Sequence, residues 1–223
     1  MNKATISADI VSSTSLDVAQ RLRLEKELKR LLNLLKQTFG TKVFYGRMMK
    51  GDYIECVLEN PKLALRVALL LKSYVKSLDF EEIKSKKFKD FKDYGIRVAV
   101  GVGELSIWNK RKGIIDGEAI HLSGRAINEM TTPDKQIRKT LVFKSKNEDW
   151  NQSFAPIFNL LDILFLKYKK AQSEVIFHKL LNHSEKEITT ILNKSQSTIN
   201  QHSKATGWSA VDSAVAYFEQ TIN

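Results

Sequence analysis

The feature that most constrains the fold is a short apolar run at residues 96–102 (IRVAVGV), which is bounded by Gly95 and Gly103. Its β-branched residues and its lack of polar alternation predict a strand that is buried on both faces. Such a strand has to belong to a sheet that other segments of the chain complete. With 223 residues, 43% of them hydrophobic and 27% charged, the chain has room for one domain of ordinary size and a small appendage.

Strands and a helix precede this run. Residues 3–11 predict a first strand, and the leucine spacing over 16–39 predicts a long amphipathic helix. Two short strands follow at 42–49 and 53–58. Because only the tripeptide KGD at 50–52 separates them, we expect a hairpin.

The second half of the predicted domain completes the sheet. A helix is expected at about 61–78, and after the buried run come a polar loop around Trp108, a helix at about 116–130 and a strand at about 141–144. The order fits an α+β fold with a ferredoxin-like split sheet and helices on one face. In that topology the first and third strands are central neighbours, so the first strand ends beside the hairpin turn.

A basic segment rich in phenylalanine lies before the buried run. Its lysines are Lys84, Lys86, Lys87, Lys89 and Lys92, and its aromatic residues are Phe80, Phe88 and Phe91. We expect a solvated helix or loop with a few anchoring rings, and the alternative is a nucleic-acid surface. The net charge of +11 does not by itself choose between these two interpretations. Residues 151–223 carry seven lysines and six acidic residues, so nearly all of the excess positive charge lies in residues 1–150.

From residue 149 onward the pattern becomes helical, so we expect an α/β domain over 1–148 and a helical C-terminal domain over 149–223. The first residues lack the pattern of a signal peptide, and no window is apolar enough for a membrane helix, which predicts a cytoplasmic protein. The single cysteine, Cys56, lies among apolar strand residues. We interpret it as a buried thiol rather than a nucleophile or a metal ligand.

The predicted topology brings two carboxylates together, Asp9 at the end of the first strand and Asp52 in the hairpin turn. Two carboxylates at one place can hold divalent cations against a triphosphate, with the metals about 4 Å apart in two-metal sites. The alternative is that both residues are caps or exposed polar groups.

The surrounding sequence resembles a known family. The words ADIVSST, KGDYIECVL, IRVAVGVGEL and DGEAIHLSGRAI occur in the order and approximate spacing of the class III nucleotide cyclases. The whole chain is similar to the SatD-like family of bacterial proteins, which pairs a cyclase-like domain with a C-terminal helix-turn-helix. The resemblance implies a nucleotide cyclase-like sheet in which Asp9 and Asp52 hold Mg²⁺ and Arg125 faces a phosphate or a developing charge. It also implies that phosphates approach Ser12, Ser13 and Thr14.

Other positions depart from the family pattern. His121 stands where cyclases carry Asn, and Met48 and Ile114 stand where they carry the purine-selecting Lys and Asp, so base selection of the usual kind is not expected. His121 lies on the helical face of Arg125 and either contacts the nucleotide or satisfies its ring against a neighbouring strand. The alternative partners of Arg125 are the carboxylates of Asp116 and Glu118.

Residues 184–208 predict a helix-turn-helix. Ser184 and Glu187 are spaced as a capping box for its first helix, and Ser195 is placed to cap its second. The short, polar second helix suits a recognition helix in the major groove of DNA. The residues expected to reach bases or phosphates are Gln196, Ser197, Thr198, Asn200, Gln201 and Lys204.

Trp208 and the final predicted helix, with apolar residues from Val211 to Phe218, are expected to pack behind the recognition helix. The alternative to DNA binding is a helical hairpin in a protein-interaction module. Because cyclase-like domains pair to build their sites, and because two modules double the DNA contacts, we expect a homodimer on a pseudo-palindrome.

Three functions fit these features. The first is a DNA-binding transcriptional regulator whose cyclase-like domain binds a nucleotide, with or without Mg²⁺. The second is a metal-dependent nucleotidyl cyclase that carries a helix-turn-helix, and the third is a scaffold with vestigial carboxylates. The retained Asp9 and Asp52 favour the first two, and the loss of the base-selecting residues favours the regulator over the enzyme.

Overall fold

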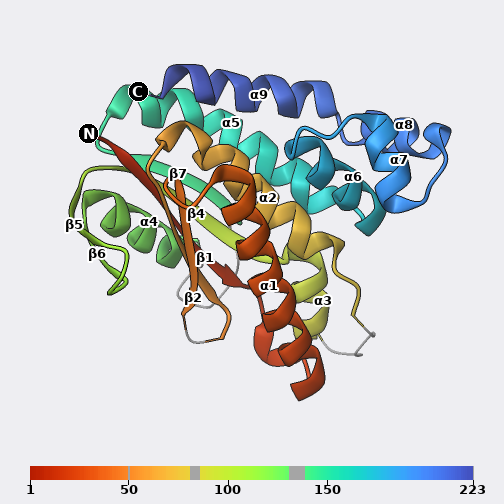
Figure 1. Ribbon diagram of the computed structural model, residues 1–223, viewed down its shortest axis with the longest axis horizontal. Helices are drawn as coiled ribbons and strands as arrows, with labels where there is room; N and C mark the ends of the chain where they lie inside the picture. Colours follow the sequence, from red (N-terminus) through yellow and green to blue (C-terminus); the bar gives the residue numbers. More distant parts are fainter. Residues whose placement is uncertain (50, 81–85, 131–138, 223) are drawn as a thin grey trace.

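The computed structural model describes residues 1–49, 51–80, 86–130 and 139–222, and these form an α+β fold around a five-stranded sheet (Figure 1). The strand order is β2-β3-β1-β4-β7; the first four are antiparallel to their neighbours, and β7 is parallel to β4. The order β2-β3-β1-β4 is that of a ferredoxin-like split sheet, which confirms the expected class. The strands are β1 (Lys3–Ile10), β2 (Phe44–Met49), β3 (Tyr53–Leu58), β4 (Ile96–Gly103) and β7 (Leu141–Ser145).

The predicted neighbourhood of the first strand and the hairpin turn is confirmed. Strand β1 lies between β3 and β4, with Asp9 opposite Tyr53 on one side and Arg97 on the other. The Ile10 N–H donates to the Asp52 carbonyl over 3.2 Å. Of the predicted turn tripeptide, Lys50 lies outside the described residues.

Helices cover both faces of the sheet, so the prediction that they lie on one face is wrong. Figure 1 shows α1 (Val18–Phe39) and α2 (Ala64–Ser77) on one side of the sheet and α4 (Glu118–Glu129) on the other. The face under α4 is lined by small and polar residues. Ser123 of α4 lies at hydrogen-bond distance from the hydroxyls of Thr5 and Ser7, at 3.0 and 2.9 Å.

Close packing explains why α4 fits there. A side chain on Gly101 would place its Cβ atom 2.2 Å from the Ala119 carbonyl oxygen, so glycine is required at this point of β4. The alternation of small residues with the apolar residues of β1 and β4 therefore builds two different faces. One receives α4, and the other receives the leucine-rich helices α1 and α2.

The expected polar loop around Trp108 is instead a hairpin of β5 (Leu105–Asn109) and β6 (Ile114–Gly117). Trp108 anchors it, because its indole N–H donates to Glu59 over 2.6 Å and its ring meets Tyr45 edge to face at 5.0 Å. These contacts are non-local, so the polar composition of the segment did not reveal them.

The basic segment forms α3 (Lys86–Tyr94), which confirms a helix with anchoring rings. Phe80, Phe88 and Phe91 are buried, and the rings of Phe80 and Phe91 pack edge to face at 5.4 Å. Lys84 lies outside the described residues. Cys56 is fully buried, as predicted, and burial raises the pKa of its thiol.

Helix α2 is covered on all sides, because C-terminal helices pack against its outer surface. One continuous hydrophobic cluster joins the sheet, α2 and the C-terminal helices. The expected boundary at 148/149 coincides with the start of α5, and a separate C-terminal domain stays a prediction. The C-terminal helices are α5 (Glu148–Lys167), α6 (Lys170–Leu180), α7 (Glu185–Leu192), α8 (Gln196–Ala205) and α9 (Trp208–Thr221).

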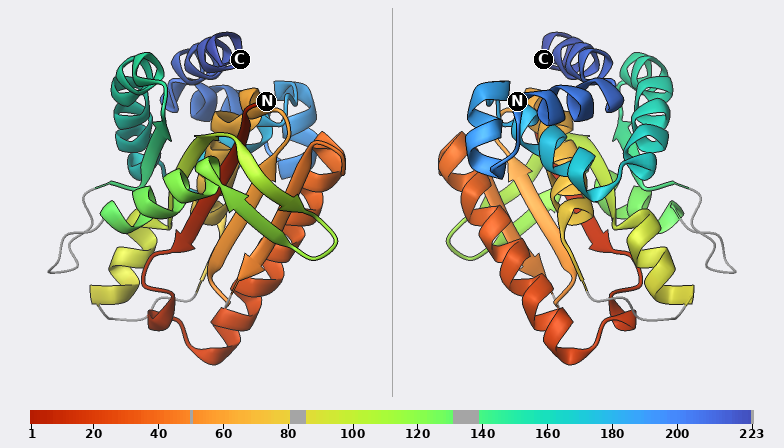
Figure 2. Two further views of the ribbon diagram at one scale, coloured as in Figure 1. Left: turned by 90° about the vertical axis from the view of Figure 1, so that its left-hand side faces the viewer. Right: turned by 90° about the vertical axis from the view of Figure 1, so that its right-hand side faces the viewer.

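Figure 2 shows α7, α8 and α9 at the end of the molecule away from the point where β1 finishes and α1 begins. In the described part of the chain, no helix is both long and apolar enough to cross a membrane.

A buried ion pair fixes α5 on α2. The Lys72 amino group lies 3.3 Å from Asp162 and donates to the Thr140 hydroxyl over 2.5 Å, and all three residues are buried. Asp162 also accepts from the Thr140 N–H over 2.7 Å. Burial lowers the pKa of Lys72 to about 8, although the nearby carboxylate opposes that shift.

We predict that Asp162→Ala lowers the free energy of unfolding by about 3 to 5 kcal/mol, because it leaves a buried ammonium without its carboxylate. Urea denaturation at pH 7 measures this. Glu25→Ala, which removes the exposed pair with Lys29, is the control and should cost at most about 0.5 kcal/mol. The double variant Lys72→Met/Asp162→Leu should recover most of the loss. Equal stability of Asp162→Ala and the control would contradict a role for this pair in holding α5.

Candidate functional site

The carboxylate of Asp9 is engaged by the protein's own arginine. Arg97 lies directly opposite Asp9 in the β1/β4 register. Its Nε donates to one carboxylate oxygen over 2.9 Å, and its Nη2 donates to the other. This bidentate geometry is the strongest form of a carboxylate–guanidinium pair. Both oxygens of Asp9 therefore already have a cationic partner.

Asp52 has a different partner, the hydroxyl of Ser13, which donates to its carboxylate over 2.5 Å. Ser12, with φ of 52°, turns the chain after β1, and residues 13–15 form a short 3-10 turn. Ser12, Ser13 and Thr14 do not cap α1. Asp17 caps the helix instead, accepting from the Gln20 N–H over 2.8 Å.

The structure gathers part of the predicted phosphate site around one pocket of about 460 Å³. Its polar lining includes Ser13, Thr14, Asp52 and Arg21, whereas Ser12 and Asp9 do not line it. Sequence reasoning missed Arg21. It lies one turn into α1, and a helix that starts beside the predicted phosphate loop was the signal that it faces the same space.

The arrangement does not fit a bound metal ion. A divalent cation needs several free oxygen ligands, but Arg97 occupies both oxygens of Asp9 and Ser13 occupies one of Asp52. No cluster of three or more His, Cys, Asp or Glu side chains with metal-site geometry occurs among the residues that the structure describes. The expected Mg²⁺ site therefore stays a prediction, and it requires Arg97 to move.

His121 and Arg125 lie elsewhere. They line a second pocket, of about 490 Å³, together with Glu104 and Lys146 near the end of β4. Asp9 faces Arg97 near the start of that strand. Within one chain, Arg125 therefore lies apart from the two carboxylates, Asp9 and Asp52.

Of these two helix residues, His121 has a partner of the expected kind and Arg125 does not. The His121 Nε2 atom lies 2.9 Å from Asp116 of β6, so the ring is satisfied against a neighbouring strand. The expected carboxylate partners of Arg125 are taken by others, since Glu118 pairs with Lys146 at 2.6 Å. Arg125 is exposed and forms no ion pair with the described residues, so the predicted pairing with Asp116 or Glu118 is wrong.

The predicted helix-turn-helix segment forms two short helices with the expected caps. The Glu187 N–H donates to the Ser184 hydroxyl over 3.3 Å, and the Ser184 N–H donates to the Glu187 carboxylate over 2.7 Å. The Ser184 hydroxyl also donates to the Glu187 carboxylate, over 2.7 Å, and this bond together with the one from the Ser184 N–H lowers the pKa of Glu187. Asn193 is left-handed, with φ of 49°, and turns the chain, and Ser195 accepts from the Thr198 N–H at the start of α8.

A small core of its own holds this module together. Ile188 of α7, Ile199 of α8 and Val175 of α6 are fully buried and pack on one another, with Leu192 beside them. Helix α6 is therefore the third helix of the module. Because α6 also packs on α2, the module is held against the rest of the protein.

The six residues predicted to contact DNA divide into two groups. The amides of Gln196 and Asn200 lie near Glu185 of α7, at 3.3 and 3.4 Å, so these side chains are partly engaged within the module. Thr198 is half-buried and contacts the Ser195 hydroxyl at 2.8 Å. Ser197 also contacts the Ser195 hydroxyl, at 2.9 Å. Gln196, Ser197, Gln201 and Lys204 are exposed, and the last three share one face of α8.

The final helix does not pack mainly behind α8, as had been expected. Phe218 of α9 lies in the main core, with ring centroids 4.7 Å from Phe154 and 5.7 Å from Phe143. Val211 and Val215 belong to the same cluster. The helical spacing identified the buried face of α9 correctly, but it did not say which neighbour that face meets.

We predict that Arg97→Gln raises the affinity for Mg²⁺ at least tenfold, because it frees the oxygens of Asp9 and removes a positive charge. Calorimetry with MgCl₂ measures this, and Arg47→Gln, which removes a similar pair with Glu55, is the control. Tight binding of Mg²⁺ by the unmodified protein, lost in Asp9→Asn, would show that Arg97 does not block the site.

Comparison with protein-family models gave no match, and a search of curated proteins gave no significant one. The resemblance to the SatD-like family and to the class III cyclases therefore stays a prediction.

Proposed function

We propose that this protein is a DNA-binding transcriptional regulator that reads DNA with α8. The observation that carries the proposal is the α6–α7–α8 module, which has its own core and presents Ser197, Gln201 and Lys204 on one exposed face. A short helix of this kind, with small and polar exposed side chains, fits the major groove, which is about 12 Å wide.

The chemistry of that face supports readout of bases as well as attachment to the backbone. Gln201 has the donor and acceptor needed to bind the edge of adenine, and Lys204 supplies a charge for a phosphate or a guanine. Ser197 lies one helical turn before Gln201, so the Ser197 hydroxyl and the Gln201 amide face the same groove. Lys194, in the turn before α8, is exposed and adds a second cation.

A homodimer compensates for the low net positive charge of the α6–α7–α8 module. Residues 151–223 carry only one more lysine than acidic residues, and phosphate contacts supply much of the affinity for DNA. Two modules on a two-fold site double these contacts, and half-sites one helical turn apart, about 34 Å, match such a dimer. We therefore propose a homodimer on a pseudo-palindromic site.

We predict that a 30-base-pair duplex selected from a random pool binds the protein in a salt-dependent manner, and that Gln201→Ala weakens binding at least tenfold, as for loss of one base contact. Lys204→Gln should instead reduce the slope of log affinity against log salt by about 1 per chain. Fluorescence anisotropy measures both effects. Gln220→Ala, an exposed glutamine of α9, is the matched control.

Two outcomes contradict the proposal. Equal binding by Gln201→Ala and Gln220→Ala would remove α8 as the recognition helix. If the selection enriches no duplex, the module is a protein-interaction hairpin and the protein is not a DNA-binding regulator.

A nucleotide is the proposed ligand of the N-terminal pocket, in keeping with the family resemblance. Thr14 and the guanidinium of Arg21 line this pocket and suit phosphate oxygens, and Ser13, whose hydroxyl donates to Asp52, lies beside them. Since Arg97 holds Asp9 and Arg125 lies in another pocket, we propose binding without turnover. The regulator is therefore preferred to the cyclase.

We predict that ATP binds in the presence of EDTA, that Arg21→Gln weakens this binding at least fivefold, and that Asp52→Asn strengthens it because a like charge is removed. Calorimetry measures the affinities, and Arg30→Gln, an exposed arginine further along α1, is the control. Binding only with Mg²⁺, lost in Asp52→Asn and accompanied by product, would establish the metal-dependent cyclase instead.

A further inference from the structure

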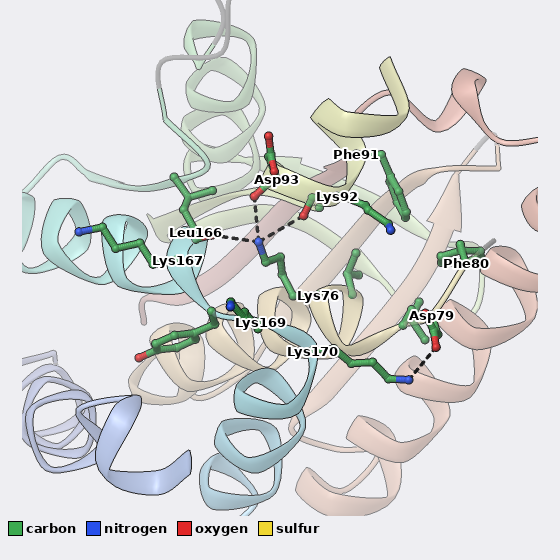
Figure 3. Close-up of a pocket in the computed structure, with 14 residues that line it drawn as sticks. Lys76, Asp79, Phe80, Phe91, Lys92, Asp93, Leu166, Lys167, Lys169 and Lys170 are labelled. Carbon is green, nitrogen blue, oxygen red and sulfur yellow. Dashed lines mark hydrogen bonds and ion pairs between the residues drawn. The ribbon is translucent and has the colours of Figure 1, made fainter. Parts of the chain in front are cut away.

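A third pocket, of about 370 Å³, lies where α2, α3, α5 and α6 meet (Figure 3). It is distinct from the N-terminal pocket, with which it shares no lining residue. Five of its lining residues are lysines and two are aspartates. The lysines are Lys76, Lys92, Lys167, Lys169 and Lys170.

Lys76 lines this pocket, and its amino group already has hydrogen-bond partners within the protein. Figure 3 shows its amino group at the centre of three dashed contacts, which are hydrogen bonds to backbone carbonyls of α3 and α5. The distances are 3.3 Å to Lys92, 2.9 Å to Asp93 and 3.0 Å to Leu166. Lys76 thus neutralises the negative ends of two helices, and burial lowers its pKa.

Other cations at the rim remain available. Lys170 pairs with Asp79 at 2.9 Å, but neither Lys92 nor Lys169 forms an ion pair with the residues that the structure describes. In Figure 3, Lys92 and Lys170 reach toward the pocket from α3 and α6, while Lys167 points away from it. The N-terminus of α6 begins at Lys170 and adds a partial positive charge at the same rim.

The walls between these cations are apolar and aromatic. The rings of Phe80 and Phe91 stand edge to face on one side. The other apolar or aromatic lining residues are Val75, Leu78, Leu166 and Tyr168. A volume of this size falls in the range of small-molecule sites, which combine apolar walls with a few placed polar groups. The combination of rings and ammonium groups suits a small organic anion with a flat apolar body.

Tyr168 connects the pocket to the recognition helix. Its side chain is 5% exposed, and its hydroxyl donates to the carbonyl of Thr206 over 2.5 Å. Thr206 is the residue that ends α8, with its N–H bonded to His202. Burial raises the pKa of the Tyr168 phenol, which keeps it protonated as the donor. One residue therefore contributes to the lining of the pocket and also holds the end of α8.

We propose that this pocket is an effector site for a small aromatic or apolar molecule carrying a phosphate or carboxylate, and that its occupancy changes DNA affinity through Tyr168. Lys92 and Lys169 bind the anionic group, and the rings of Phe80 and Phe91 contact the apolar body. The effect on DNA rests on the proposed function of α8, whereas binding of the ligand does not.

The binding test uses the full chain and phenyl phosphate as the probe, with inorganic phosphate for comparison. Calorimetry should show phenyl phosphate binding at least tenfold tighter than phosphate. The double variant Lys92→Gln/Lys169→Gln should lose at least tenfold of that affinity, and Lys167→Gln should retain it, because Lys167 points away from the pocket. Thermal melts report whether each variant is folded. No binding at millimolar probe, or equal binding by the double variant and the control, overturns the site.

The coupling test repeats the DNA titration with and without saturating phenyl phosphate. We expect at least a threefold change in DNA affinity in the unmodified protein and none in Tyr168→Phe, which keeps the ring and loses the hydroxyl. Binding of the probe without any change in DNA affinity overturns the coupling. If no DNA is bound under any condition while the probe still binds and the lysine variants lose it, the function of α8 fails and the pocket stands.

Discussion

Burial of α2 on every side is the constraint on which the rest of the structure depends. A helix that is apolar around most of its circumference has no stable place at a surface, so both the sheet and the C-terminal helices have to cover it. The basic side chains of α2 then bind the C-terminal helices that cover it. Arg66 donates to Glu219 of α9 over 2.7 Å and to the Leu180 carbonyl at the end of α6 over 3.1 Å. Lys72 and Lys76 reach α5 in the same way, so the placement of the helix-turn-helix follows from α2.

The chemistry of the N-terminal end follows from one antiparallel register. Because β1 and β4 place Asp9 opposite Arg97, the carboxylate that would hold a metal is paired within the protein. A guanidinium in this geometry is a fixed cation bound to Asp9, which a metal would have to displace. Such a site favours binding of a phosphate by hydroxyls and arginine over metal-assisted chemistry, which is why we place a sensor there rather than an enzyme.

Much of the fold was accessible from the sequence because its signals are local. Apolar periodicity located α1, α2 and β4, and capping residues located α7 and α8, since both depend on neighbours within a few positions. The sequence did not predict the β5–β6 hairpin, the packing of α4 on the second face of the sheet or the partners of α9. These features depend on contacts between distant residues, such as Trp108 with Glu59. The same holds for the candidate site. Asp52 lies in the hairpin turn and Ser13 and Thr14 follow β1 directly, as the predicted topology required, whereas Arg97 enters only through strand pairing.

The positions of the pockets decide which ligand can act on α8. The N-terminal pocket lies where α1 begins, at the far end of the molecule from α7 and α8 in Figure 2. A signal from it has to cross the packed core through α2, where Arg66 donates to the carbonyl of Leu180 at the end of α6, within the module. The lysine-lined pocket needs one residue, Tyr168, to reach Thr206. Coupling requires an element with two arrangements, and the end of a short helix opens at a lower free-energy cost than a buried core. A ligand beside Tyr168 is therefore better placed than one beside Arg21 to move the end of α8.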